Sequence, residues 1–213
     1  ITASPALYRE REAYTRLLLG PKFAALRREF WDWRSWRREI PEKARKLLIT
    51  LGGSDPKNVT EKVIHAVGQV EYDLEITVIL GAGQVDRIEE ISRKTGDAKG
   101  ICFVSTPPNM AELMADADIA ITAGGSTCWE LAFMGVPAMI VTTAENQRGI
   151  GPALSQAGTA IDLGWADSLH PSSIADQLQG LITSARTRKR FSDRGRGLVD
   201  SHGGERVIEA IHG

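Results

Sequence analysis

The stretch IAITAGGSTCWELAFMGVPAMIVT, residues 119–142, decides the fold class. It begins with an apolar run of strand length at 119–122 and passes through a Gly-Gly turn into a helical stretch at 127–134. A second apolar run follows at 138–142. A strand, a helix and a strand in this order predict two parallel strands joined by a right-handed crossover.

The same alternation runs from residue 46 onward. The predicted strands are residues 46–51, 74–80, 100–104, 119–122, 138–142 and 159–162. The predicted helices are residues 59–70, 84–95, 109–115, 127–134, 147–156, 172–184, 187–198 and 204–211. Because runs such as Leu47-Leu48-Ile49 are apolar without a break, they suit a sheet that is covered on both faces. We therefore expect an α/β fold with a Rossmann-like, doubly wound parallel sheet of about six strands.

Residues 1–45 differ from this pattern and hold too little apolar material to enclose a core. Residues 8–19 and 22–30 are predicted helices, separated by the helix-breaking pair Gly20-Pro21. We therefore divide the chain into a helical arm, residues 1–45, and a ligand-binding body, residues 46–213. Tryptophans lie among arginines late in the arm. Such mixtures bind single-stranded nucleic acid elsewhere, but this one is short and contains acidic residues, which favours an arm that bridges two lobes.

The composition is that of an ordinary globular protein, and its formal net charge of −1 gives no general reason to expect nucleic acid or an anionic membrane as a partner. Residues 1–46 hold 12 Lys and Arg against 6 Asp and Glu, and the remainder holds 14 against 21. Solvated helix faces explain this asymmetry better than an interaction surface does. Two scattered cysteines make neither a disulfide framework nor a metal site. With no signal peptide and no run of about 18 apolar residues, we expect a cytoplasmic protein without a membrane span, metal or cofactor.

Ligands bind at the carboxyl ends of the strands in such a sheet. The loops at those ends are residues 52–58, 81–83, 105–108, 123–126 and 143–146. Gly124, Gly125, Ser126 and Thr127 precede a helix, where free backbone N–H groups can hold a phosphate or diphosphate. Glu130 follows one turn later. Its spacing from Thr127 matches a capping box, which we favour on spacing alone, and the alternative is a carboxylate that accepts hydrogen bonds from the two hydroxyls of a ribose.

The loop after the first strand offers a second set of candidates. Gly52 and Gly53 permit a sharp turn and a close approach of the backbone to a ligand, and Ser54 belongs to the same turn. Asp55 has two interpretations of equal weight. It either bonds a sugar hydroxyl or serves as a turn residue ahead of a proline.

Three further residues follow other strands. The backbone at the strand end Val104 can contact a base edge. Asn146 and Gln147 carry amides that suit sugar hydroxyls or an N-acetyl group, and they equally suit an ordinary helix start. The four histidines have no neighbour in the sequence that indicates general base catalysis, so we interpret them as structural or solvated.

Taken together, these loops resemble a known family. Residues 123–137, AGGSTCWELAFMGVP, are similar to the nucleotide-binding segment of GT-B enzymes, and above all to the UDP-sugar hydrolases of pseudaminic acid synthesis. Those enzymes release UDP from UDP-2,4-diacetamido-2,4,6-trideoxy-β-L-altrose. Further matches, in the family's order, are LGPKFAALRREF at 19–30, LGGSDP at 51–56, ENQ at 145–147 and DSHGGERV at 200–207. In the last, Ser201-His202 replace a shorter turn that contains glycine. The resemblance spans nearly the whole chain.

The resemblance implies roles for several candidates. In the lipid II glycosyltransferase, which is related to the family, the acidic residue that matches Glu130 holds the ribose. This implies that Glu130 binds ribose, that the turn at 124–127 cradles the diphosphate, and that Val104 lies at the uracil. It also makes Asn146 and Gln147 sugar contacts.

The resemblance implies that the catalytic residue lies outside this chain. The family's proposed catalytic histidine lies in a Gly-x-Gly-His motif of the N-terminal lobe, and this sequence has no such motif. We therefore expect a chain that binds a UDP-sugar, pairs with its own N-terminal lobe and contains no catalytic residue. On this resemblance, residues 1–45 are the end of the N-terminal lobe and the interlobe arm, and residues 46–213 are the UDP-sugar-binding lobe.

We thus expect the UDP-sugar-binding lobe of a hydrolase in bacterial nonulosonic (pseudaminic) acid synthesis, in which water attacks the bond between sugar and diphosphate. Two alternatives stay open. One is a GT-B glycosyltransferase lobe that uses a UDP-sugar donor, because the acceptor site belongs to the other lobe. The other is a non-catalytic nucleotide-binding module that docks a partner through its arm.

Overall fold

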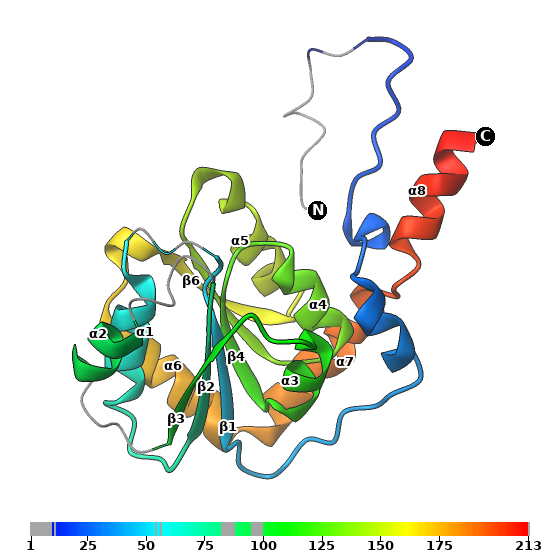
Figure 1. The fold of residues 1–213 in the computed structure, drawn as a ribbon. Coiled ribbons are helices and arrows are strands. Elements are labelled where there is room, and N and C mark those ends of the chain that lie inside the picture. The colour runs from blue at the N-terminus through cyan, green and yellow to red at the C-terminus, as the bar shows by residue number, and fades with distance from the viewer. Residues whose placement is uncertain are drawn as a thin grey trace.

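The computed structural model describes residues 10, 12–53, 55, 57–81, 88–94 and 100–212. At its centre six parallel strands form one sheet in the order β3-β2-β1-β4-β5-β6 (Figure 1). The strands are β1 (Lys46–Thr50), β2 (Glu75–Leu80), β3 (Ile101–Ser105), β4 (Ile119–Ala123), β5 (Ala138–Thr142) and β6 (Ala160–Trp165). The strand order reverses between β1 and β4, as in a doubly wound Rossmann-like sheet. The predicted fold class is confirmed.

Helices cover both faces of this sheet (Figure 1). One face carries α1 (Val59–Val67), α2 (Ile88–Lys94) and α6 (Pro171–Thr183). The other carries α3 (Met110–Asp116), α4 (Thr127–Phe133) and α5 (Ile150–Gln156), and α7 (Ala185–Leu198) packs against α4. Two short 3-10 helices, η5 (Glu145–Gln147) and η6 (Ala166–Ser168), lie in the connections. Across the described ranges, none of the helices is both long and apolar enough to cross a bilayer.

The central strand β1 shows why the apolar runs are continuous. Leu47 and Ile49 point into the core beneath α1 and α6, whereas Leu48 points into the core beneath α3 and α4. Successive side chains of a strand alternate between faces, so a strand buried on both sides needs apolar residues at every position. The sheet is therefore fixed in register from both sides, and the ends of β1 and β4 are held next to each other.

The arm is where the prediction of local structure is wrong. Residues 10 and 12–19, the described part of the helix predicted at 8–19, form a bend, a turn and irregular chain. In place of the helix predicted at 22–30, the chain forms two short 3-10 helices, η2 (Pro21–Phe23) and η3 (Arg28–Trp33), with extended backbone at Arg27 between them. A helix of this length is marginal in water unless it buries an apolar face, and residues 12–19 bury no side chain fully.

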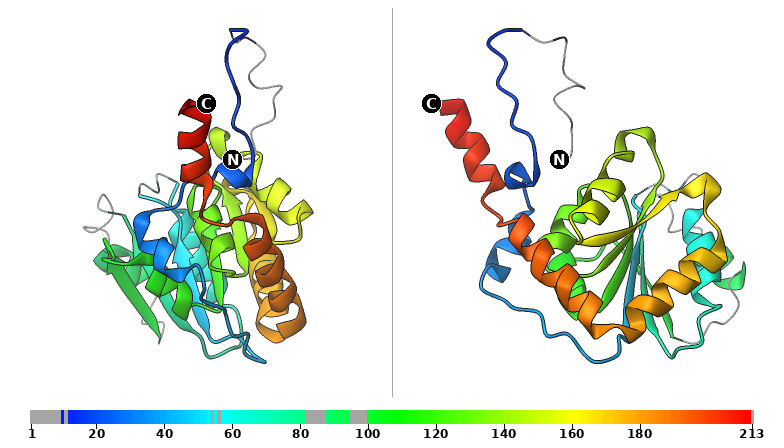
Figure 2. Two further views of the ribbon diagram at one scale, coloured as in Figure 1. Left: turned by 90° about the vertical axis from the view of Figure 1, so that its right-hand side faces the viewer. Right: turned by 180° about the vertical axis from the view of Figure 1, so that it is seen from behind.

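The second half of the arm packs on the body. Phe30 is fully buried and meets the ring of Phe133 edge-on, with 6.3 Å between the ring centroids. Arg38 donates to three backbone carbonyls at the ends of α3 and α4, those of Met114, Ala117 and Met134. Figure 2 shows the last helix, α8 (Gly203–His212), extending away from the sheet beside the arm, where it contacts η2. The arm is thus built into the surface formed by α3, α4 and α8.

The contact between the arm and α8 gives a first testable prediction. A Cβ added to Gly203 would lie 2.2 Å from the carbonyl oxygen of Ala24, whereas one on Gly204 would meet no described atom within 4 Å. We expect Gly203→Ala to lower the free energy of unfolding by about 1–3 kcal/mol, because the backbone of the arm must move. Gly204→Ala is the matched control and should leave it unchanged or slightly higher. Urea denaturation measures both, and equal effects would contradict the close approach.

Candidate functional site

The candidate site lies where the strand order reverses. The carboxyl ends of β1 and β4 are neighbours, and a glycine pair follows each strand, Gly52-Gly53 after β1 and Gly124-Gly125 after β4. Such a reversal opens a crevice at the end of the sheet. Here it is a pocket of about 520 Å³ lined by Ala25, Arg27, Thr50, Gly52, Gly53, Ile79, Leu80, Gly81, Thr106, Pro107, Met110, Ser126, Thr127 and Glu130.

Glycine is required at two positions in the wall of this pocket. Gly52 has a φ of 99°, a left-handed conformation that other residues rarely adopt. A Cβ on Gly81 would lie 2.3 Å from the Cα of Gly53. The loops after β1 and β2 therefore touch through their backbones, and this contact holds the first glycine turn against the mouth of the pocket.

The turn after β4 presents unpaired backbone donors. Cys128 and Trp129 donate their N–H groups to the carbonyls of Gly125 and Ser126, at 3.1 and 3.0 Å, which closes the first turn of α4. The N–H groups of Ser126 and Thr127 have no acceptor in the part of the chain that the structure describes. Both residues line the pocket, so the turn can bind an anion through its main chain.

The carboxylate of Glu130 is held by an arginine of the arm. Nε and Nη2 of Arg27 donate to Oε1 and Oε2 of Glu130, at 2.7 and 3.1 Å. The side chain of Glu130 is 8% exposed and that of Arg27 is 50% exposed. This two-bond pairing raises the pKa of Arg27 above its ordinary value. Ser126, the residue that caps α4, makes no side-chain capping bond within the described chain. Glu130 is thus not in the capping box that its spacing favoured.

A strained residue forms part of the opposite wall. Thr106, directly after β3, has a φ of 49°. This left-handed conformation is unfavourable for a β-branched side chain and is found mostly where surrounding structure imposes it. Thr106 belongs to the loop at 105–108 that the strand-end rule indicated, and it lines the pocket together with Pro107.

The structure brings Gly52, Gly53, Ser126, Thr127 and Glu130 together around one pocket. The remaining candidates do not line this pocket or are outside the described residues. Gly124 and Gly125 belong to the same turn as Ser126, Val104 lies half-buried in the edge strand β3, and Asn146 is exposed in η5. Ser54 is outside the described residues.

Two candidates are occupied by local hydrogen bonds. Asp55 is buried, and its carboxylate accepts the N–H groups of Val59 and Thr60 at 2.8 and 2.7 Å, so it caps the start of α1. The side-chain oxygen of Gln147 accepts the N–H and hydroxyl of Thr143 at 2.9 and 3.0 Å. In this structure both side chains stabilise their own loops.

Arg27 is the charged pocket residue that sequence reasoning missed. It is separated from Glu130 by 103 positions, and no local pattern links two residues so far apart. A weak signal existed, since Arg27 lies inside the motif at 19–30 that carries the resemblance. That motif was assigned to the connection between lobes rather than to the ligand site.

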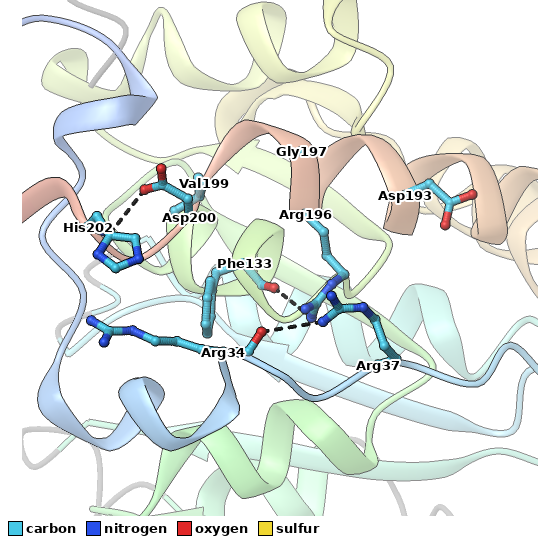
Figure 3. Close-up of a pocket in the computed structure, with 9 residues that line it drawn as sticks. All are labelled: Arg34, Arg37, Phe133, Asp193, Arg196, Gly197, Val199, Asp200 and His202. Atoms are coloured by element: carbon cyan, nitrogen blue, oxygen red, sulfur yellow. Dashed lines mark hydrogen bonds between the residues drawn. The ribbon is translucent and has the colours of Figure 1, made fainter.

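A second hollow, shown in Figure 3, joins the arm to α7 and contains none of the predicted site residues that the structure describes. Arg34 and Arg37 of the arm lie on one side of it and Arg196 of α7 on the other. Arg196 donates to the carbonyl of Phe133 at 3.2 Å, and Arg37 donates to the carbonyl of Arg34 at 3.3 Å. The side chain of Arg34 donates to the hydroxyl of Ser201 at 2.9 Å and to the carboxylate of Glu205 at 3.3 Å, which ties the arm to the segment that leads into α8. We therefore assign this hollow to the docking of the arm.

Comparison with known proteins places the chain in a family. A model of the glycosyltransferase family 28 C-terminal domain matches residues 47–197. The chain is 30% identical, over 197 residues, to the spore coat polysaccharide biosynthesis protein SpsG of Bacillus subtilis (strain 168), an alignment that covers 92% of this chain and 56% of the relative.

N-acetylglucosamine transferases are also similar. The UDP-N-acetylglucosamine–N-acetylmuramyl-(pentapeptide) pyrophosphoryl-undecaprenol N-acetylglucosamine transferase of Actinobacillus pleuropneumoniae is 27% identical over 169 residues, 77% of this chain and 47% of the transferase. Among solved structures, MurG of Acinetobacter baumannii has a TM-score of 0.67 at 21% identity, covering 83% of this chain and 54% of that one. The chain thus spans about half the length of these relatives. It belongs to the glycosyltransferase family 28 C-terminal domain family.

Proposed function

We propose that this chain is the nucleotide-sugar-binding part of an enzyme that releases UDP from a 2,4-diacetamido-2,4,6-trideoxy sugar by hydrolysis, in bacterial nonulosonic (pseudaminic) acid synthesis. The observation that carries the nucleotide part is the position of Glu130. Its buried carboxylate lines the same pocket as the unpaired N–H groups of Ser126 and Thr127, so a ribose acceptor and a diphosphate donor set lie one helical turn apart.

Each part of the substrate then has a candidate partner. The main chain of residues 124–127 binds the diphosphate, and Glu130 accepts hydrogen bonds from the ribose hydroxyls. Val104 lies at the uracil, and Gly52 and Gly53 let the backbone approach the ligand. A substrate contact by Ser54 and sugar contacts by Asp55, Asn146 and Gln147 remain part of the proposal. For Asp55 and Gln147 they require present hydrogen bonds to be exchanged.

The chemistry follows from where charge develops. When water attacks the sugar carbon bound to the diphosphate, that bond breaks and negative charge grows on the departing UDP. Donors already aimed at the diphosphate stabilise this charge without rearranging. We assign no residue of this chain to the activation of water, a role that the proposal leaves to an N-terminal lobe.

A glycosyltransferase lobe fits the same geometry equally well, with a sugar acceptor in place of water. The similarity to an N-acetylglucosamine transferase favours this second candidate. A hydrolase and a transferase differ in the product that is formed from the sugar. If the full-length gene product releases UDP and free sugar from the diacetamido UDP-sugar without an acceptor, it is a hydrolase. UDP release that requires an acceptor identifies a transferase.

The nucleotide part is tested by calorimetric titration of the chain with UDP, ADP and GDP. We expect a preference for UDP, and we expect Glu130→Ala to weaken UDP binding about tenfold to a hundredfold, since it removes charge-assisted hydrogen bonds worth about 1.5–3 kcal/mol. Glu112→Ala is the control, because Glu112 is exposed on the neighbouring helix α3 and lies outside the pocket lining. Equal affinity for all three nucleotides, or no effect of Glu130→Ala, would contradict the proposal.

A further inference from the structure

We infer that Arg27, from the arm, is a nucleotide-binding and positioning residue: it stays paired with Glu130 when the nucleotide binds, and its exposed guanidinium edge contacts the diphosphate. This inference rests on the proposed function and extends it to a residue outside the sheet. It makes the arm part of the binding site.

The first support is geometric. Arg27 is fixed on several sides while half of its side chain stays exposed in the pocket lining. It makes two hydrogen bonds to Glu130, and Nη1 lies 3.0 Å from a carboxylate oxygen of Glu29. Its guanidinium carbon also lies 5.4 Å from the centre of the Phe30 ring. Glu29 is in turn tied to α3, accepting the N–H of Met110 at 3.2 Å. An arginine held in this way is preorganised for a ligand rather than free on the surface.

The second support is the cost of separating the pair. Glu130 is nearly buried, and a buried carboxylate that loses its counter-charge is strongly destabilised. Ribose hydroxyls are neutral and cannot replace that charge. A carboxylate has about four lone-pair positions, of which Arg27 uses two, so two hydroxyls can be accepted with the arginine still in place. The pairing is therefore compatible with ribose binding and also fixes the direction of the carboxylate.

The third support is the charge of the pocket. Of the described residues that line it, Glu130 carries the negative charge and Arg27 is the single cation. Without Arg27, a negatively charged diphosphate would enter a pocket of the same sign. With it, the two charged side chains of the lining cancel, while Glu29, the second carboxylate paired with Arg27, lies outside the lining. The half-exposed guanidinium of Arg27 is also planar, a geometry that matches phosphate oxygens well.

The opposing hypothesis is that Arg27 blocks the carboxylate of Glu130 in the empty site and must move away before ribose binds. The two hypotheses predict effects of opposite sign. Removal of a blocking residue strengthens nucleotide binding, whereas removal of a binding and positioning residue weakens it.

The test titrates the 213-residue chain with UDP and with uridine, for the wild type, Arg27→Met, Arg27→Lys, Glu130→Gln and the double variant Arg27→Met/Glu130→Gln. The control is Arg28→Met, since Arg28 is the next residue, is exposed and has no recorded polar partner in the described chain. Thermal melts of each variant establish that the comparison is between folded chains.

We expect Arg27→Met to weaken UDP binding by at least about tenfold and uridine binding by less, because uridine has no diphosphate. Arg27→Lys should recover part of the loss for UDP, and Arg28→Met should change neither ligand. In the Glu130→Gln background, Arg27→Met should no longer affect uridine but should still weaken UDP. This split between the two ligands distinguishes binding from a purely structural role, which would weaken both equally.

Two results overturn the inference. If the wild type binds UDP and depends on Glu130, but Arg27→Met binds UDP as tightly or more tightly, the inference fails and the proposed function stands. If the wild type binds no UDP, the proposed function and the inference fail together.

Discussion

Replacing Arg188 with methionine should lower the free energy of unfolding by about 3 kcal/mol. Arg188 is fully buried, and its guanidinium donates to four backbone carbonyls, those of Pro41, Glu42, Leu181 and Ile182. The first two belong to the chain that leaves the arm, and the last two to the final turn of α6, where carbonyls have no partner within the helix. One side chain therefore satisfies acceptors from two segments that are far apart in the sequence.

The size of the effect follows from two opposing terms. Each buried carbonyl left without a donor costs about 1–3 kcal/mol, but the carbonyl of Ile182 keeps the N–H of Ala44 at 3.1 Å. Removing a desolvated charge also recovers part of the loss. Methionine is also long and flexible, so it leaves a small cavity at most. Arg186→Met is the matched control, because Arg186 is exposed near the start of the same helix α7. Urea denaturation of both variants measures the difference, and a loss below about 1 kcal/mol for Arg188→Met would show that water replaces the guanidinium.

The body of the fold was predictable because its central strands are apolar almost without a break. Runs such as Leu47-Leu48-Ile49 indicate a strand buried on both faces whatever surrounds it, and the structure places every predicted strand. The order of the strands was not predicted. That β4 lies beside β1, rather than beside β3, depends on how the helices cover the sheet, and no single segment contains that information.

The arm was mispredicted because its conformation depends on contacts far away in the sequence. The pattern at 22–30 suits a short helix, yet Ala24 and Phe30 are buried against the body with extended backbone at Arg27 between them. A few buried anchors outweigh local helix preference, which contributes only tenths of a kcal/mol per residue. A long-range contact likewise determines the conformation of Glu130. Its local spacing fits a capping box, but its carboxylate pairs instead with Arg27, 103 residues away.

Asp55 and Gln147 illustrate a different limit. Short polar side chains in loops compete between ligands and their own backbone, and the sequence left both interpretations open. In this structure both side chains accept hydrogen bonds from nearby backbone N–H groups. Such residues become distinguishable only when the loop geometry is known.

Replacing Phe30 with alanine should lower the free energy of unfolding by about 3–5 kcal/mol, the usual cost of removing a buried aromatic ring. Phe30 has no exposed surface and packs edge-on against Phe133 of α4. Trp31→Ala is the control, since the neighbouring Trp31 is 46% exposed and its loss should cost less than about 1 kcal/mol. Three of the five tryptophans lie in the arm, at positions 31, 33 and 36. Tryptophan fluorescence therefore follows mainly the arm, and far-UV circular dichroism follows the body.

Tryptophan fluorescence and circular dichroism together show whether the arm and the body unfold cooperatively. If both change together in urea, arm and body unfold as one unit and Phe30→Ala shifts one transition. If the arm separates first, Phe30→Ala moves the fluorescence transition to lower urea while the circular dichroism transition stays. In either case the guanidinium of Arg27, 5.4 Å from the ring that is lost, is less firmly held, so UDP binding should weaken as well. If the Phe30→Ala chain is less stable but binds UDP as tightly as the wild type does, the arm has no role in nucleotide binding. Its packing on the body would then contribute to stability alone.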